Sequence, residues 1–399
     1  MFSCVYYFHF VKFFYCLLFL LSALNGNSQK ILRGIIVDST KNHPIPNATV
    51  FVSGTSNGVK TNEQGEFSLW IPNGKYNLVV ISTGYKTYNK AIHTNELPDS
   101  ITISLNIKPN QKIKYDRNVW ANWGETFFNN LIGSSTAAQN CKIKNHKALH
   151  FLAQENNEIS VTADEPLVIE NKALGYTITF QLEFFRYNVS TGYCTYLGFP
   201  FFQSMQGSAN IQEKWNKKRT EAYEGSMMHF MRSVYLNRIN EEGFEVRRLQ
   251  KVRNTAWLES NQHYINDSDI QKNPMSSEGK KMQSLYDQIL NPDDYKEIIG
   301  TSLIGDSIAY AIDKTTAGLD FDNFLLILFK KKESPAEYQI LYNQTGMMSQ
   351  IILINQKPIE ISGNGSYYAP ADLLFLGYWE WSERIGNMLP FDYNLIKLP

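Results

Sequence analysis

The sequence predicts a mainly β protein, in which an N-terminal β-sandwich precedes a larger α+β region that is rich in strands and carries one long helix. Three observations lead to this prediction. Aromatic residues make up 14% of the chain, and aromatic side chains favour strands. Short alternating apolar segments separated by turn residues fill positions 30–105, as in sandwiches. A chain of 399 residues is also too long for one sandwich, because domains usually hold about 100–200 residues.

The N-terminus predicts a signal peptide over residues 1–28. Phe13–Leu24 is a 12-residue apolar core, within the usual length of about 7–15 residues. Gly26 and Ser28 follow at small-x-small spacing, so cleavage is expected after Ser28. The alternative is an uncleaved anchor, since Val5–Leu24 approaches the length of about 20 residues that spans a bilayer. Both interpretations predict export to the periplasm or the outer-membrane-associated cell envelope.

Composition excludes several partners. The formal net charge is zero, so no overall positive field would attract nucleic acid. No segment after the signal approaches 18 apolar residues, so no transmembrane span is expected there. The mature chain keeps Cys141 and Cys194. In an oxidising compartment they either pair in a disulfide or stay free and buried.

The sandwich is predicted over residues 29–105. Phe67 and Leu69 alternate with polar neighbours, which indicates a strand with one buried face. Pro44 and Pro46 forbid a helix where they stand. The expected strands cover residues 31–37, 48–52, 66–69, 76–80 and 101–105, and the expected turns include Asn62–Gly65 and Asn73-Gly74.

Four landmarks in this region resemble the carboxypeptidase regulatory-like domain. They are Gly34–Asp38 with Pro46–Val50, then Thr61–Leu69, then Gly74–Leu78, and then Gly84-Tyr85. The resemblance implies a seven-stranded sandwich of transthyretin-like topology. It implies no peptidase activity, because this domain is the non-catalytic accessory of the carboxypeptidases.

A polar linker over residues 106–119 leads to a second region over residues 120–399. A helix is expected over Gln212–Asn240, where apolar residues recur at helical spacing and Gly243 ends the pattern. A polar helix is expected over Ser276–Leu290. The expected strands are Glu158–Val168, Gly175–Phe185, Phe244–Leu249, Ser307–Ile312, Phe324–Lys330 and Ser349–Ile354.

The second region is also similar to a family of cell-envelope proteins of the Bacteroidetes type. The resemblance rests on Glu165–Tyr176, Lys214–Ser233 and Gly377–Tyr393. In that family the same regulatory-like sandwich precedes a region of unassigned function. The resemblance therefore implies a cell-envelope location and no particular chemistry.

Two motifs in the sandwich mimic catalytic signatures. His93 and Glu96 form an H-x-x-E, but zinc catalysis needs a third ligand and a general base in context. We interpret the pair as a solvated strand end. Gly54–Gly58 satisfies G-x-S-x-G around Ser56. That motif works at a strand-to-helix turn, whereas here it joins two expected strands, so we interpret it as a glycine-rich loop.

The long helix places five polar or aromatic residues within three turns, namely Arg219, Tyr223, Ser226, His229 and Arg232. Such a constellation could line a ligand groove. Alternatively, His229 is a satisfied core histidine and the arginines pair with nearby glutamates.

Two tryptophans near the C-terminus, Trp379 and Trp381, could stack on sugar rings, or they could belong to the core. Exposure of both would favour glycan binding, and burial of both would favour a structural role.

The sequence therefore favours a non-enzymatic exported envelope protein whose sandwich is an interaction or support module. The alternatives are a glycan- or peptide-binding protein with its site in the second region, and an uncharacterised hydrolase. We expect no metal and no cofactor, and an envelope protein or glycan as the partner.

Overall fold

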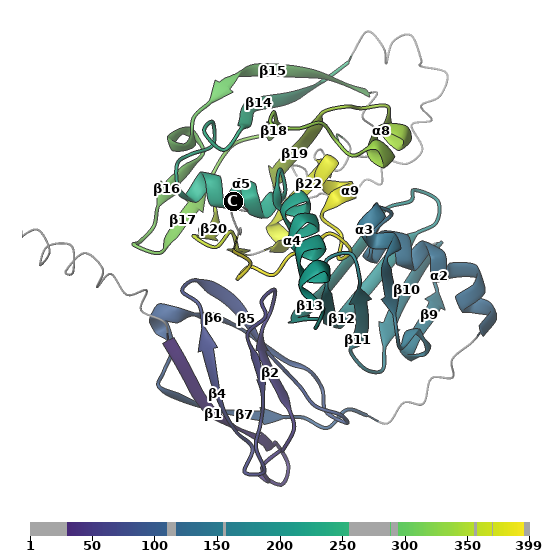
Figure 1. Ribbon diagram of the computed structural model, residues 1–399, viewed down its shortest axis with the longest axis vertical. Coiled ribbons are helices and arrows are strands. Elements are labelled where there is room, and N and C mark those ends of the chain that lie inside the picture. Colours follow the sequence, from purple (N-terminus) through teal and green to yellow (C-terminus); the bar gives the residue numbers. More distant parts are fainter. Residues whose placement is uncertain are drawn as a thin grey trace, which may run out of the picture.

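The structure is a computed structural model that describes residues 30–109, 117–154, 157–254, 288, 294–354, 357–368 and 370–394. Figure 1 shows the sandwich in purple below, a second sheet with its helices to the right, and the sheets of the last third of the chain above. The predicted mainly β fold is confirmed. Among the described residues, no helix is long and apolar enough to cross a membrane.

The N-terminal part is a β-sandwich of two sheets. The first has the order β4-β1-β7 and the second the order β3-β2-β5-β6. Phe67 and Leu69 point into the core between them, where they are 6% and 1% exposed, as the alternation in the sequence predicts. The strands are β1 (Lys30–Asp38), β2 (Thr49–Val52), β3 (Gly58–Lys60), β4 (Glu66–Ile71), β5 (Lys75–Ile81), β6 (Tyr88–His93) and β7 (Ser100–Leu105), with a 3-10 helix η1 (Thr94–Glu96) before β7.

A six-stranded sheet follows, organised around the long strand β12. Along one edge β12 pairs first with β11 and then with β10, and along the other edge it pairs with β13. The elements are α2 (Arg117–Leu131), α3 (Thr136–Gln139), β8 (Cys141–Ile143), η2 (His146–Ala148), β9 (Leu149–Ala153), β10 (Glu158–Ala163), β11 (Leu167–Asn171), β12 (Tyr176–Asn188) and β13 (Cys194–Ser204).

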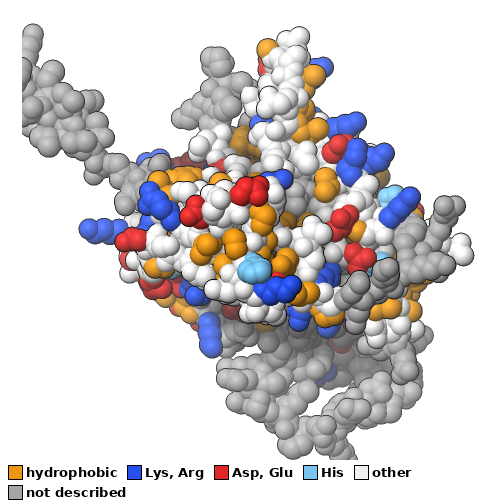
Figure 2. Space-filling view, turned by 90° about the horizontal axis from the view of Figure 1, so that it is seen from below, with side chains coloured by type: hydrophobic (Ala, Val, Ile, Leu, Met, Phe, Trp, Pro, Cys, Tyr) orange, Lys and Arg blue, Asp and Glu red, His pale blue; other side chains and the backbone are white. Residues whose placement is uncertain are grey.

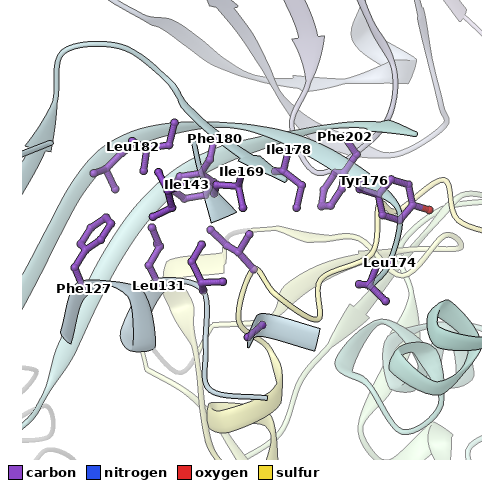
Figure 3. Packing of buried hydrophobic residues seen from close by; sticks show 14 of the residues in the cluster. Phe127, Leu131, Ile143, Ile169, Leu174, Tyr176, Ile178, Phe180, Leu182 and Phe202 are labelled. Atoms are coloured by element: carbon purple, nitrogen blue, oxygen red, sulfur yellow. The ribbon is translucent and has the colours of Figure 1, made fainter. Parts of the chain in front are cut away.

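Helix α2 packs on this sheet. Figure 3 shows Phe127 and Leu131 of α2 pointing toward the apolar face that Ile178, Phe180 and Leu182 present. The C-terminal segment packs into the same core with Ile385, Leu389 and Tyr393. The C-terminal segment therefore packs against a sheet whose strands lie about 200 residues earlier in the sequence.

The last third contains a five-stranded sheet, β15-β14-β18-β19-β22, and a four-stranded sheet, β16-β17-β20-β21. Helix α5 buries Phe230, Met231 and Val234 in the core that both sheets share. The elements are α4 (Ala209–Tyr223), α5 (Met227–Tyr235), β14 (Phe244–Arg253), β15 (Tyr295–Leu303), η6 (Gly305–Ser307), β16 (Ala309–Ala311), β17 (Thr316–Leu319), β18 (Phe324–Phe329), α8 (Ala336–Tyr342), β19 (Met347–Leu353), β20 (Ile359–Ser362), β21 (Tyr367–Tyr368), η7 (Pro370–Asp372), β22 (Leu373–Gly377) and α9 (Tyr378–Ser382).

The prediction of one helix over Gln212–Asn240 is wrong. The chain forms two helices, α4 and α5, because Gly225 between them has a φ of +77°, a conformation that interrupts a right-handed helix. Ser226 then starts α5 by accepting a hydrogen bond on Oγ from the amide of His229. Buried apolar residues continue at near-helical spacing from Trp215 and Tyr223 of α4 to Met227, Phe230 and Val234 of α5, so the periodicity does not show the break.

Other boundaries also differ from the predictions. Helix α2 begins at Arg117, inside the expected linker over residues 106–119, and it contains most of the apolar segment Phe127–Ile132. The single strand expected over Glu158–Val168 is two strands, β10 and β11. Strand β13 was not predicted. The helix expected over Ser276–Leu290 lies outside the described residues, apart from Gln288.

Cys141 and Cys194 are free thiols, so the disulfide alternative is wrong. Cys141 pairs with Asn171 of β11, which pairs with Tyr176 at the start of β12. Cys194 of β13 pairs with Tyr187, near the end of β12. Those positions are roughly 35 Å apart along the strand, at about 3.3 Å per residue. A disulfide needs Cα atoms within about 7 Å. Burial raises the pKa of both thiols to about 12, so both are poorly reactive.

Candidate functional site

Arg219 lies on α4 with its guanidinium buried. It donates from Nε to the carbonyl oxygen of Leu174 at 2.7 Å and from Nη2 to that of Gly175 at 3.2 Å. Its guanidinium also stacks 4.1 Å above the ring centre of Tyr176. The side chain therefore holds α4 against the turn before β12, and these contacts occupy one edge and one face of the guanidinium.

His229 lies on α5 and is 6% exposed. Its Nδ1 accepts a hydrogen bond from the amide of Gly225 at 3.2 Å, so Nε2 carries the proton and faces Glu242 Oε2 at 3.2 Å. Burial lowers the pKa of His229, against the opposing effect of the Glu242 carboxylate. Both ring nitrogens are therefore engaged within the protein, in agreement with a satisfied core histidine.

Arg232 holds the end of the chain in place. Its Nη2 donates to the carbonyl oxygens of Phe391 and Tyr393 at 3.1 and 2.8 Å, and its Nε donates to that of Asn364 at 2.9 Å. The guanidinium lies 5.3 Å from the ring centre of Tyr223. Tyr223 is itself 8% exposed, and burial raises the pKa of its hydroxyl.

Trp379 and Trp381 are 1% and 7% exposed. The indole of Trp379 donates to the carbonyl oxygen of Gly225 at 2.8 Å, and that of Trp381 donates to Ser134 Oγ at 3.0 Å. Neither ring offers a free face to a sugar. Their burial favours the structural role over stacking on a glycan.

The H-x-x-E motif lies where the sequence places it, at the end of β6 and in η1. His93 Nδ1 is 4.0 Å from Glu96 Oε1, and the Glu96 side chain is 83% exposed. No group of three or more His, Cys, Asp or Glu side chains within the described ranges could hold a metal ion.

The Gly54–Gly58 loop has a role that the sequence did not reveal. The amide of Gly54 donates to the carbonyl oxygen of Pro200 in β13 at 2.7 Å, and the carbonyl of Gly54 accepts from the amide of Phe391 at 2.7 Å. The amide of Ser56 donates to Asp392 Oδ1 at 2.8 Å, and the Ser56 hydroxyl donates to Oδ2. This loop therefore docks the sandwich on β13 and on the C-terminal segment.

Apolar and ionic contacts extend this docking surface. Phe51 and Val79 from the four-stranded sheet of the sandwich pack against Phe199 and Phe201 of β13. The rings of Phe51 and Phe201 are 5.2 Å apart. A few residues away, Lys75 Nζ forms an ion pair with Glu360 Oε1 at 2.9 Å. The sandwich thus contacts the rest of the chain through backbone hydrogen bonds, apolar packing and an ion pair.

Two neighbouring cavities lie beside this junction. A cavity of about 190 Å³ opens between the sandwich, β13 and the C-terminal segment. A larger one of about 540 Å³ runs along α4. Glu383 lines both. Its carboxylate accepts a hydrogen bond from the amide of Met227 at 2.9 Å, and burial raises its pKa to about 7. The sequence carried no signal for Glu383 or Asp392, since neither belongs to a catalytic or metal-binding motif.

The surface carries charges of both signs. On the face shown in Figure 2, Lys and Arg side chains are interspersed with Asp and Glu, as the net charge of zero leads us to expect. That face has no single-sign field of the kind that steers nucleic acid.

Residues 32–116 match the model of the CarboxypepD_reg-like domain, in agreement with the predicted resemblance. No curated protein matches the chain. Three solved structures are similar in part. One is a protein of unknown function, proposed to be membrane-associated, from Bacteroides fragilis NCTC 9343, with 10% identity, a TM-score of 0.17 and coverage of 83% of this chain and 93% of that one.

The second is a DUF3823 family protein from Parabacteroides merdae ATCC 43184, with 9% identity, a TM-score of 0.16 and coverage of 47% of this chain and 85% of that one. The third is 3-chlorocatechol 1,2-dioxygenase from Rhodococcus opacus 1CP, with 12% identity and a TM-score of 0.18. The match covers 21% of this chain and only 61% of the dioxygenase.

Proposed function

We propose that this chain, whose residues 32–116 match the model of the CarboxypepD_reg-like domain, is a non-enzymatic exported protein of the cell envelope in which that domain supports the second region. The observation that carries the proposal is the docking of the Gly54–Gly58 loop on β13 and Asp392. The backbone and the serine of this loop form hydrogen bonds with the second region, so the loop holds the two regions together. Its serine donates to a carboxylate instead of facing a substrate.

Further support comes from the residues that the sequence singled out for binding. Arg219, His229 and Arg232 direct their polar atoms at backbone or carboxylate groups of the same chain. Buried polar groups that lose such partners destabilise a protein, by about 1–3 kcal/mol each. This arrangement is typical of residues that hold a fold together.

The support role is tested by replacing Gly54 with Ala. Gly54 has a φ of +77°, and a Cβ there would lie 2.6 Å from a ring carbon of Phe391. Gly84→Ala is the matched control, because Gly84 has a φ of +83° and open space around it. We expect Gly84→Ala to cost about 1 kcal/mol from backbone strain, and Gly54→Ala to cost about 1–3 kcal/mol more from overpacking.

The measurement is urea unfolding followed by tryptophan fluorescence. Six of the seven tryptophans lie outside the sandwich, since only Trp70 belongs to it. The signal therefore reports on the region that the sandwich supports. Equal losses for the two variants would mean that the loop contributes nothing to the stability of the second region.

Export is tested by expression of the full chain in a Gram-negative host. We expect the protein in the envelope fraction, with a mature N-terminus at or near Gln29, because the Phe13–Leu24 segment and the small residues after it are typical of a cleaved signal. N-terminal sequencing and fractionation measure both. A cytosolic protein that starts at Met1 would contradict the proposal.

A further inference from the structure

The cavity along α4 lies within the second region, and we call it the α4 groove. Its volume of about 540 Å³ lies in the range of sites that hold small organic ligands. One wall is a face of α4, on which Ile211, Lys214, Lys218 and Ala222 recur at helical spacing. The opposite wall comes from α3, from the start of α8 and from α9 with Glu383.

The cations of the groove are not all neutralised within the protein. Lys218 forms an ion pair with Glu221 at 2.7 Å. Lys172 and Lys214 are exposed and have no ion-pair or side-chain hydrogen-bond partner within the described part of the chain. The indole of Trp215 donates to the carbonyl oxygen of Lys172 at 2.9 Å, which holds Lys172 beside the Lys214 turn of α4. One end of the groove therefore carries two uncompensated positive charges.

The other end carries an acid and a hydroxyl. Glu383 accepts one hydrogen bond, from the amide of Met227, and within the described ranges it has no cation at salt-bridge distance. Ser382 beside it is 7% exposed, and its Oγ has no hydrogen-bond partner among the described residues. A buried polar atom without a partner is costly, so a ligand that supplies a partner gains affinity from both groups.

We propose that the α4 groove binds a short peptide with free termini, whose ammonium group lies at Glu383 and Ser382 and whose carboxylate lies at Lys172 and Lys214. The two ends of the groove set the length. Lys214 and Ala222 are eight residues apart on α4, which is about 12 Å at 1.5 Å per residue. An extended peptide advances about 3.3–3.6 Å per residue, so three or four residues span the groove.

The polarity of the site follows from the same charges. The peptide ammonium donates to the Glu383 carboxylate, whose charged form it stabilises, and to Ser382 Oγ, and the peptide carboxylate accepts from the two lysines. A neutral sugar would leave the charged groups at both ends unpaired. This binding activity goes beyond the proposed support role and does not depend on the docking loop, so either can fail without the other.

The test is calorimetric titration of the full mature protein at low salt with trialanine. Its N-acetylated form, its C-terminal amide and maltotriose are the matched probes. We expect saturable binding of trialanine and an affinity at least about tenfold lower for each blocked form, since each block removes a charge-assisted hydrogen bond. Binding of the blocked forms as tight as that of trialanine, binding of maltotriose alone, or no binding of any probe would overturn the proposal.

The residues are tested with Lys214→Gln and Lys217→Gln. Both lysines are exposed on α4, but only Lys214 lines the groove. We expect Lys214→Gln to weaken trialanine binding about threefold to tenfold and Lys217→Gln to leave it unchanged, with the same thermal midpoint for both variants. Ser382→Ala should weaken binding of trialanine and leave that of its N-acetylated form unaffected. Equal affinities for the two lysine variants would contradict the assignment of the carboxylate end.

Discussion

At the scale of single residues, the position of Glu383 in the fold raises the pKa of its carboxyl group. Glu383 follows α9 and lies beside the start of α5, where it is partly buried. Within the described part of the chain its carboxyl group accepts one hydrogen bond, from the amide of Met227, which stabilises the charged form too weakly to offset the burial. The pKa of Glu383 is therefore raised from 4.5 to about 7.

This shift predicts how stability depends on pH. The folded state keeps the Glu383 proton between about pH 4.5 and pH 7, where the unfolded state has lost it. Stability therefore falls as the pH rises through this window. A shift of that size corresponds to at most about 3 kcal/mol. Glu383→Gln stays neutral at every pH, so we expect the variant to gain stability relative to the wild type from pH 5 to pH 8.

Urea unfolding at a series of pH values measures the difference, with Glu213→Gln as a control for the loss of one exposed carboxylate on α4. If the stability difference between Glu383→Gln and the wild type is the same at pH 5 and pH 8, the carboxyl group is not held protonated by the fold.

At the scale of elements, the break between α4 and α5 organises the second region. Gly225 turns the chain at a φ of +77°, and its carbonyl oxygen accepts from the indole of Trp379. A side chain at this position would meet Met347 and Phe329, since a Cβ would lie 2.4 and 2.9 Å from their atoms. The break therefore lets α4 pack on the six-stranded sheet while α5 packs between the other two.

The two helix starts give a matched pair of substitutions. Ser226 caps α5 with a hydrogen bond from the amide of His229 to Oγ, whereas Ser208 stands at the start of α4 with no such bond. We expect Ser226→Ala to cost about 1 kcal/mol of unfolding free energy and Ser208→Ala to cost less than about 0.5 kcal/mol. Urea unfolding measures both, and a larger loss at Ser208 would show that the break is not held by this cap.

For the whole molecule, the sandwich and the sheets behind it share an apolar contact. Phe201 of β13 is 7% exposed and packs on Phe51 of the sandwich. Gly58 lies directly against the Phe201 ring, since a Cβ there would be 2.5 Å from a ring carbon. Contacts this close predict that the two regions unfold together in one cooperative transition.

Phe201→Ala should separate the two regions. We expect a loss of about 3–5 kcal/mol, the usual cost of removing a buried aromatic ring, and circular dichroism and tryptophan fluorescence transitions that no longer coincide. Phe184→Ala on the neighbouring β12 is the control, because Phe184 is 38% exposed, and it should cost less than about 1 kcal/mol. Coincident transitions in both variants would mean that the apolar contact does not couple the regions.

Local patterns were enough to predict the sandwich, since the alternation around Phe67 and the turns after Asn62 and Asn73 depend only on residues near in sequence. The same patterns failed where distant segments meet. Nothing near Gly54 or Ser56 indicates that the loop bonds to residues more than 300 positions away. Helical periodicity could not reveal the break at Gly225. Burial, unlike strand alternation, is a property of the packed molecule, so the free thiols and the raised pKa of Glu383 were decided by the tertiary structure alone.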